Sequence, residues 1–124
     1  MVTRREELIS LTERFADAFN RQNLDDVVSF FAEDGVYEDT RDGRHQGKTA
    51  IREAFVNLVT GGRGRIRFDP EDLFVESETG KVMVSWTLHT HLDTDPQSHR
   101  GMDILYFEGD KLKNKLAYTK AKPD

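Results

Sequence analysis

The spacing of apolar residues changes once along this chain, and this change constrains the fold more than any other feature. In residues 3–20, Leu8, Leu11, Phe15 and Phe19 recur at helical spacing, so one face of a long helix is apolar. From about residue 66 onward, apolar and polar residues alternate instead, most regularly in KVMVSWTLHTHL at 81–92. Helices followed by a long antiparallel meander predict an α+β fold with the helices on one face of a curved sheet.

Further helices and strands complete the predicted order of elements. Asn23 caps a short helix, LDDVVSFF, which the following AEDG closes, and a third helix begins at Lys48 and ends near two glycines at 61–62. A short strand at 36–39 separates these two helices. The remaining strands are expected at 66–75, with an interruption near Pro70, and at 100–107 and 112–121.

Length and composition bound the class of protein. A chain of 124 residues fits one domain, which we expect to span 1–124, and it can bury a core without disulfides. The chain contains no cysteine, which excludes a disulfide framework, a thiolate metal site and a cysteine nucleophile, and agrees with a cytoplasmic location. The first residues, MVTRREELISLTERF, are charged and then amphipathic, so we expect neither a signal peptide nor a membrane span.

The charge pattern argues against nucleic acid as a partner. The formal net charge is −5, and GGRGRIR at 61–67 is the one short basic cluster of the sequence. This cluster lacks the Lys-Ser/Thr pair of a phosphate-binding loop, and the chain has no GxSxG motif of a serine hydrolase. We interpret the cluster as a solvated loop that runs into a strand.

The order of elements and two short motifs resemble a known superfamily. NLDDVVSFFAEDGVYEDT and GKTAIREAF are similar to segments of the NTF2-like superfamily, and within it of SnoaL-like and ketosteroid-isomerase-like proteins, over about residues 14–120. The resemblance implies a cone in which three N-terminal helices pack on the concave face of a curved, mainly antiparallel sheet. It also implies homodimers through the sheet. This fold hosts isomerases, cyclases, dehydratases, epoxide hydrolases and non-catalytic modules, so the fold does not choose among these functions.

Two carboxylates match functional positions of ketosteroid isomerase. Asp39, in YEDT, falls where that enzyme places its general base. Asp103, in RGMDILYF, falls where the enzyme keeps a protonated acid that donates to the substrate oxyanion. Two departures oppose the match, because Phe15 and Phe55 occupy the positions of an oxyanion-hole tyrosine and of a supporting tyrosine. A phenyl ring donates no hydrogen bond, which argues against a steroid isomerase of the usual kind.

The residue pattern leaves two interpretations open for each carboxylate. Asp103 lies among apolar residues of its strand, so it either takes up a proton or pairs with a cation such as Lys115 or Arg100. Asp39 shares a strand face with Tyr37, and it faces the cone if Tyr37 does. Alternatively, Asp39 caps the turn that follows, which is a frequent role of Asp.

We therefore predict a mainly apolar pocket for a small hydrophobic molecule, without a cofactor, in which Asp39, His99 and Asp103 are the polar groups that orient the ligand. Its predicted walls are Phe15, Phe19, Tyr37, Phe55, Val84, Trp86, Leu88 and Leu105. If the protein is an enzyme, Asp39 abstracts a proton next to a carbonyl and Asp103 stabilises the enol, which is the first step of isomerisation, aldol cyclisation and dehydration. Epoxide opening, and a ligand-binding or dimerisation module without turnover, remain as alternatives.

The histidines and the last lysines do not extend this site. His89 and His91 lie on the opposite strand face from His99, so the three imidazoles do not converge and we expect no metal. The faces that Lys113 and Lys115 occupy stay open at this stage, because a shift of one residue in the EGDK turn exchanges them.

Overall fold

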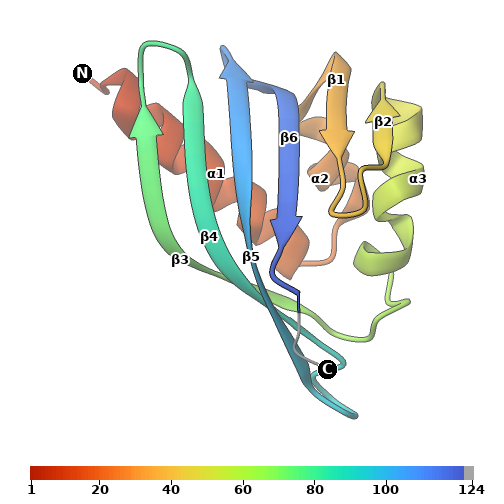
Figure 1. The fold of residues 1–124 in the computed structure, drawn as a ribbon. Helices are drawn as coiled ribbons and strands as arrows, with labels where there is room; N and C mark the ends of the chain where they lie inside the picture. The colour runs from red at the N-terminus through yellow and green to blue at the C-terminus, as the bar shows by residue number, and fades with distance from the viewer. Residues whose placement is uncertain (122–124) are drawn as a thin grey trace.

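The computed structural model describes residues 1–121 and has the predicted α+β architecture. Within these residues, three helices and six strands follow one another (Figure 1). Their bounds are, in chain order, α1 Arg4–Asn20, α2 Leu24–Ser29, β1 Phe31–Glu38, β2 Arg44–Gln46, α3 Lys48–Val59, β3 Arg67–Glu76, β4 Lys81–Thr90, β5 Gln97–Glu108 and β6 Lys111–Thr119.

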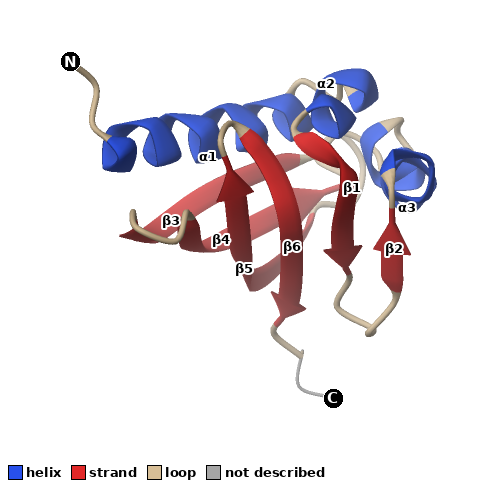
Figure 2. Ribbon diagram, turned by 90° about the horizontal axis from the view of Figure 1, so that it is seen from above, coloured by secondary structure: helices blue, strands red, loops and turns tan. Residues whose placement is uncertain are grey.

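The strands form one sheet in the order β2-β1-β6-β5-β4-β3 (Figure 1). Neighbouring strands are antiparallel except β1 and β6, which run parallel. The helices lie on one face of the sheet, with α1 across it and α3 beside β1 and β2 (Figure 2). The three helices are not consecutive, because β1 and β2 lie between α2 and α3 in the chain.

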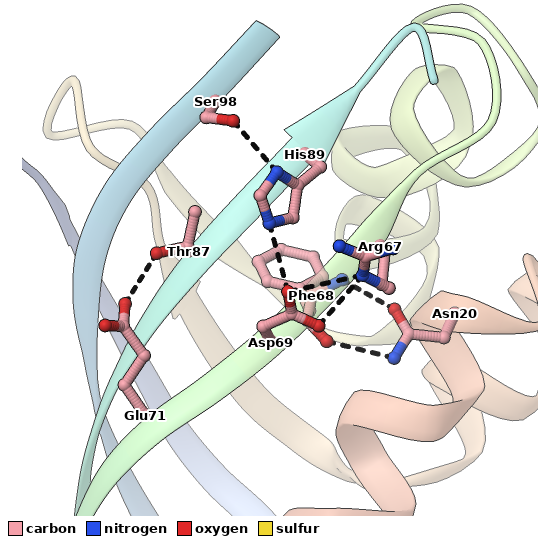
Figure 3. Close-up of polar contacts among 8 residues, drawn as sticks. All are labelled: Asn20, Arg67, Phe68, Asp69, Glu71, Thr87, His89 and Ser98. Carbon is pink, nitrogen blue, oxygen red and sulfur yellow. Dashed lines mark hydrogen bonds and ion pairs between the residues drawn. The ribbon is translucent and has the colours of Figure 1, made fainter. Parts of the chain in front are cut away.

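The longest helix, α1, lies across the sheet and is tied to β3 (Figure 2). Thr3 caps its first turn, since the Thr3 hydroxyl oxygen accepts a hydrogen bond from the Glu6 N–H at 3.1 Å. At its last residue, the Asn20 side chain donates to the Phe68 carbonyl at 3.0 Å and accepts from the Phe68 N–H at 2.6 Å (Figure 3). The apolar stripe predicted from the sequence is thereby held over the inner face of the sheet.

The second helix is shorter than predicted, and the first strand is longer. α2 ends at Ser29 and β1 begins at Phe31, so the AEDG segment that the sequence predicts as the end of a helix lies inside a strand. Phe31 is fully buried and lies opposite Leu112 of β6. Pairing with the last strand of the chain is a long-range contact, and such a contact overrides local propensity. β2, which the sequence does not predict, pairs with β1 in antiparallel orientation.

Alternation in β4 separates an inner from an outer face of the sheet, as predicted. The inner residues Val82, Val84, Trp86 and Leu88 are buried in the core. A register shift between Pro70 and Asp72 interrupts β3 close to the predicted position. Phenylalanine rings from α1, β1, α3 and β3 fill the space between helices and sheet, and most of their contacts are edge to face: Phe15, Phe19, Phe31, Phe55 and Phe68. None of the helices within residues 1–121 is long and apolar enough to cross a membrane.

Candidate functional site

A small cavity lies between α1 and the inner face of the sheet. Its volume is about 30 Å³, which is enough to hold a water molecule. Eight apolar residues and three polar ones line it: Phe15, Ala16, Phe19, Phe68, Pro70, Val84, Trp86 and Leu105, together with Thr12, Asp103 and Lys115. The cavity therefore brings two opposite charges into a mainly apolar wall.

Asp103 and Lys115 form an ion pair at this wall. The Lys115 Nζ lies 3.2 Å from Asp103 Oδ1, and the side chains are only 7% and 10% exposed, respectively. The two residues come from neighbouring strands, where Asp103 lies opposite Ala117 and Lys115 opposite Leu105, so they are diagonal neighbours on the inner face. Each of these buried charges is stabilised by the other, because an isolated buried charge is very costly. Of the two interpretations of Asp103, the structure shows pairing with a cation.

Two aromatic rings lie against the Lys115 ammonium group. Its Nζ is 4.8 Å from the centroid of the Tyr37 ring and 5.7 Å from that of Phe55, distances at which a cation is attracted to an aromatic face. The two rings stack on each other with centroids 4.4 Å apart. Burial raises the pKa of the Tyr37 phenol, and the charges of Asp103 and Asp39 add to this effect against the opposing charge of Lys115. The Tyr37 hydroxyl therefore stays neutral near pH 7.

The ion pair retains unused hydrogen-bonding capacity. A lysine ammonium group has three N–H donors and a carboxylate has two acceptor oxygens. Among residues 1–121, the Nζ–Oδ1 contact is the hydrogen bond that this pair makes with side chains or backbone. Both groups can thus bind a further polar atom that enters the cavity.

The structure corrects the predicted position of Asp39. Its Oδ1 accepts hydrogen bonds from the N–H groups of Arg41 at 2.9 Å and Gly43 at 2.8 Å, and its Oδ2 lies 3.0 Å from Nε2 of His45. The hydrogen bond from His45 lowers the pKa of the Asp39 carboxyl; burial opposes this, and the N–H groups of Gly43 and Arg41 reinforce it. Asp39 holds the turn between β1 and β2 and does not line the cavity. The alternation of faces that includes Tyr37 does not extend to Asp39, because the strand ends at Glu38, one residue earlier.

His99 and three of the predicted wall residues also lie away from the cavity. His99 Nε2 accepts a hydrogen bond from the Arg63 guanidinium at 3.0 Å, which ties β5 to the loop before β3. Leu88 is buried in the core, and Tyr37 and Phe55 lie behind Lys115 instead of facing the cavity. The remaining predicted residues, which are Phe15, Phe19, Val84, Trp86, Leu105 and Asp103, do line the cavity.

Sequence reasoning did not assign five lining residues to the pocket. Thr12 and Ala16 precede Phe15 and Phe19 by one helical turn or less on α1, so the helical spacing contains that signal. Phe68 and Pro70 come from the irregular strand β3. The sequence left the sheet face of Lys115 undecided, because a register shift between Tyr106 and Phe107 determines that face. No local pattern shows this shift.

The outer face of the sheet carries His89, as predicted. Its Nδ1 lies 2.8 Å from the Ser98 hydroxyl and its Nε2 lies 3.0 Å from Oδ2 of Asp69, which also binds Arg67 (Figure 3). His91 differs from the prediction, because β4 ends at Thr90 and His91 lies in the following turn with φ at 50°.

Sequence comparison places these features in a family. Residues 12–114 match the SnoaL-like domain. The chain belongs to the SnoaL-like domain family. No curated protein sequence matches this SnoaL-like chain.

Several solved structures are similar to this SnoaL-like domain. An NTF2-like protein from Mesorhizobium loti has a TM-score of 0.78 at 23% identity, with 98% of this chain and 97% of that chain covered. SalBIII, an epoxide hydrolase/cyclase-like enzyme of pyran ring formation in the polyether salinomycin, has a TM-score of 0.82 at 16% identity, with 95% of each chain covered. A protein with a ketosteroid isomerase-like fold from Catenulispora acidiphila has a TM-score of 0.75 at 16% identity, with 87% and 83% covered. These likenesses show the fold, which is NTF2-like.

Proposed function

We propose that this SnoaL-like protein binds a small, mainly apolar carbonyl compound in the cavity and transfers a proton at the carbon next to the carbonyl. The observation that carries the proposal is the buried Asp103–Lys115 ion pair in an apolar cavity wall. Asp103 acts as the general base and Lys115 donates a hydrogen bond to the carbonyl oxygen. Similar structures, such as the epoxide hydrolase/cyclase-like SalBIII, agree with small-molecule chemistry in this fold.

The proton transfer needs no cofactor. The free oxygen of Asp103 removes a proton from the α-carbon, and the C–H electron pair moves into an enolate whose oxygen becomes negative. The Lys115 ammonium group stabilises that oxygen, and it does so strongly because apolar walls exclude water. Return of the proton to another carbon gives an isomer, whereas attack of the enolate on a second carbonyl closes a ring.

This proposal gives the role of base to Asp103 and leaves Asp39 in the turn. Asp103 accepts the hydrogen bond of the Lys115 ammonium group, so in this proposal the carboxylate takes the part of the base and the ammonium group that of the donor. Asp39 is held by its hydrogen bonds to Arg41 and Gly43, outside the cavity. The predicted acid role of Asp103 therefore passes to Lys115.

Ligand entry requires the cavity to expand. Pockets that enclose a small organic ligand usually have volumes of about 300 Å³ or more, and this cavity measures about 30 Å³. The rings of Phe19, Phe68 and Trp86 form much of its wall. Movement of these rings is the expected response to a ligand.

The test is the exchange of α-protons, because exchange precedes isomerisation, cyclisation and dehydration alike. Cyclohexanone is incubated in D₂O with the protein, and the loss of its α-proton signals is followed by NMR. We expect exchange above the buffer rate, and a loss of roughly a hundredfold or more in Asp103→Asn and in Lys115→Met. Asp39→Asn is the matched control and should retain the wild-type rate.

Two results would contradict the catalytic proposal. If Asp39→Asn abolishes exchange while Asp103→Asn does not, the base is Asp39 and not Asp103. If cyclohexanone shifts protein resonances but does not exchange its protons, the protein is a ligand-binding module without turnover. The position of Asp39 in a turn, outside the cavity, is the observation that favours this second candidate.

We also propose that the outer face of the sheet mediates a homodimer. Phe74, Met83, Ile104 and Leu116 lie side by side across β3, β4, β5 and β6 on that face, and the Phe74 side chain is 67% exposed. A row of partly exposed apolar residues across four strands is typical of an interface. Sedimentation equilibrium should show that the wild type is a dimer and that Ile104→Lys is a monomer. The control Asp95→Lys, in the β4–β5 turn, should remain a dimer. A wild type that is monomeric at high concentration would refute the proposed dimer.

A further inference from the structure

The indole of Trp86 carries a buried hydrogen-bond donor that has no acceptor. Its Nε1 is inaccessible to solvent and has no partner among the described residues. Trp86 lines the same cavity as Asp103 and Lys115. Buried N–H groups almost always have a partner, because a donor taken from water without one lowers stability. An acceptor that enters the cavity with a ligand would supply the missing partner.

The indole ring is held by the strands on both sides of β4. A Cβ at Gly101 of β5 would lie 2.3 Å from Cη2 and 2.5 Å from Cζ2 of Trp86, so the ring occupies the space that a side chain would otherwise fill. On the other side, the Phe68 ring of β3 meets it edge to face, with centroids 5.4 Å apart. Cross-strand pairing places Pro70, which has no N–H, opposite Trp86. The ring therefore fills the space between these strands, and it must shift for an acceptor to reach its buried N–H.

We infer that the Trp86 N–H and the Lys115 ammonium group together bind one acceptor oxygen of the ligand. This inference rests on the proposed function, and it specifies the ligand class. A carbonyl oxygen has two lone pairs and no proton, so it can accept from both donors at once. A hydrocarbon and an alkylammonium ion both lack an acceptor lone pair. Trp86 is thus a specificity residue for ketone, aldehyde or ester carbonyl groups.

The chain offers a matched control for this donor. Thr90 Oγ1 is the other buried side-chain polar atom without a partner among the described residues. Thr90 lies on the same strand and is fully buried, but it does not line the cavity. Thr90→Val removes an unpaired polar group without changing the ligand site.

Two isosteric probes separate the effect of the carbonyl oxygen on binding from the effect of the ligand's shape. Cyclohexanone and methylenecyclohexane differ only in the exchange of C=O for C=CH₂. The chain contains a single Trp, so its indole N–H gives one resolved signal in a ¹H–¹⁵N spectrum. Both probes are titrated against the wild type, Trp86→Phe, Thr90→Val and a protein in which the Trp is replaced biosynthetically by benzothienylalanine, which keeps the ring shape and lacks the N–H.

We expect cyclohexanone to move the indole N–H proton signal downfield and to bind about tenfold more tightly than methylenecyclohexane. The benzothienylalanine protein should lose this preference and bind methylenecyclohexane within twofold of the wild type. Trp86→Phe should show the same loss, and Thr90→Val should behave as the wild type. The benzothienylalanine protein serves as the second variant if the smaller Phe ring disturbs folding.

The outcomes distinguish the failure of this inference from that of the proposed function. If cyclohexanone binds and exchanges its α-protons, but the benzothienylalanine protein keeps the full preference for the ketone, Trp86 is not a ligand donor and the proposed function stands. If neither probe binds the wild type, the carbonyl-binding function itself fails. An equal shift of the indole signal with both probes also overturns the role of the N–H.

Discussion

Removing the charge of Lys115 is the most direct way to measure how much the buried ion pair contributes to the free energy of unfolding. Lys115→Met keeps an unbranched side chain of similar length and leaves the Asp103 carboxylate buried, at 10% exposure, without its cation. At the observed separation of 3.2 Å, the attraction between the charges is about 5 kcal/mol for an effective dielectric constant of about 20. Measured losses for breaking one side of a buried pair are about 3–5 kcal/mol. We expect the free energy of unfolding to fall by an amount in this range.

The assay is urea unfolding at pH 7, followed by far-UV circular dichroism and by Trp86 fluorescence. For a chain of 124 residues, 1 kcal/mol corresponds to roughly 4 °C in melting temperature, so thermal unfolding should show a decrease of about 12–20 °C. Lys113→Met is the matched control, because Lys113 lies two residues away on β6 and pairs with Asp34 at 2.8 Å on the exposed side. That variant should unfold close to the wild type.

A double variant separates lost charge pairing from lost packing. Asp103→Leu with Lys115→Met replaces both charges by apolar side chains, and such replacements are often neutral or stabilising by about 1–4 kcal/mol. The double variant should therefore be more stable than Lys115→Met alone. If Lys115→Met costs less than about 1 kcal/mol, or if the double variant is less stable than the single one, the pair is not the buried, mutually dependent unit described above.

Three further substitutions test other parts of the structure. Gly101→Ala places a Cβ 2.3 Å from the Trp86 ring and should cost about 1–3 kcal/mol by overpacking, with a shift of the indole N–H signal. Asn20→Ala removes both hydrogen bonds to the Phe68 backbone and should cost about 2 kcal/mol in urea unfolding; an unchanged midpoint would contradict this. The hydrogen bond from His45 is the largest cause of the lowered pKa of the Asp39 carboxyl in the folded state. The ionised carboxylate therefore stabilises the folded protein above the unfolded pKa of about 3.9. This contribution is lost as the pH falls through the folded pKa. Asp39→Asn should therefore be less stable than the wild type at pH 7 and equal to it at the acid end, and a difference that grows on acidification would refute this.

Elements with a strong local period were predictable. The apolar stripe on α1 and the alternation in β4 appear in the structure as predicted, because each depends on side-chain directions within one element. The interruption of β3 near Pro70 was also predicted, since proline lacks the N–H that a ladder needs. The predicted boundary between α2 and β1 was wrong, because the parallel pairing of β1 with β6 places Phe31 in the sheet.

Local residue patterns were enough to predict the α+β class, the inner face of β4 and the place of Asp103 among apolar residues. Contacts between distant parts of the chain, which local patterns do not contain, pair Asp103 with Lys115, hold Asp39 in a turn and leave the Trp86 N–H without an acceptor. This difference arises because alternation specifies a face within one strand, whereas the partner across the sheet depends on register. The register shift between Tyr106 and Phe107 is set by the pairing of β5 with β6, and a slip of one residue would have turned Lys115 to the solvent.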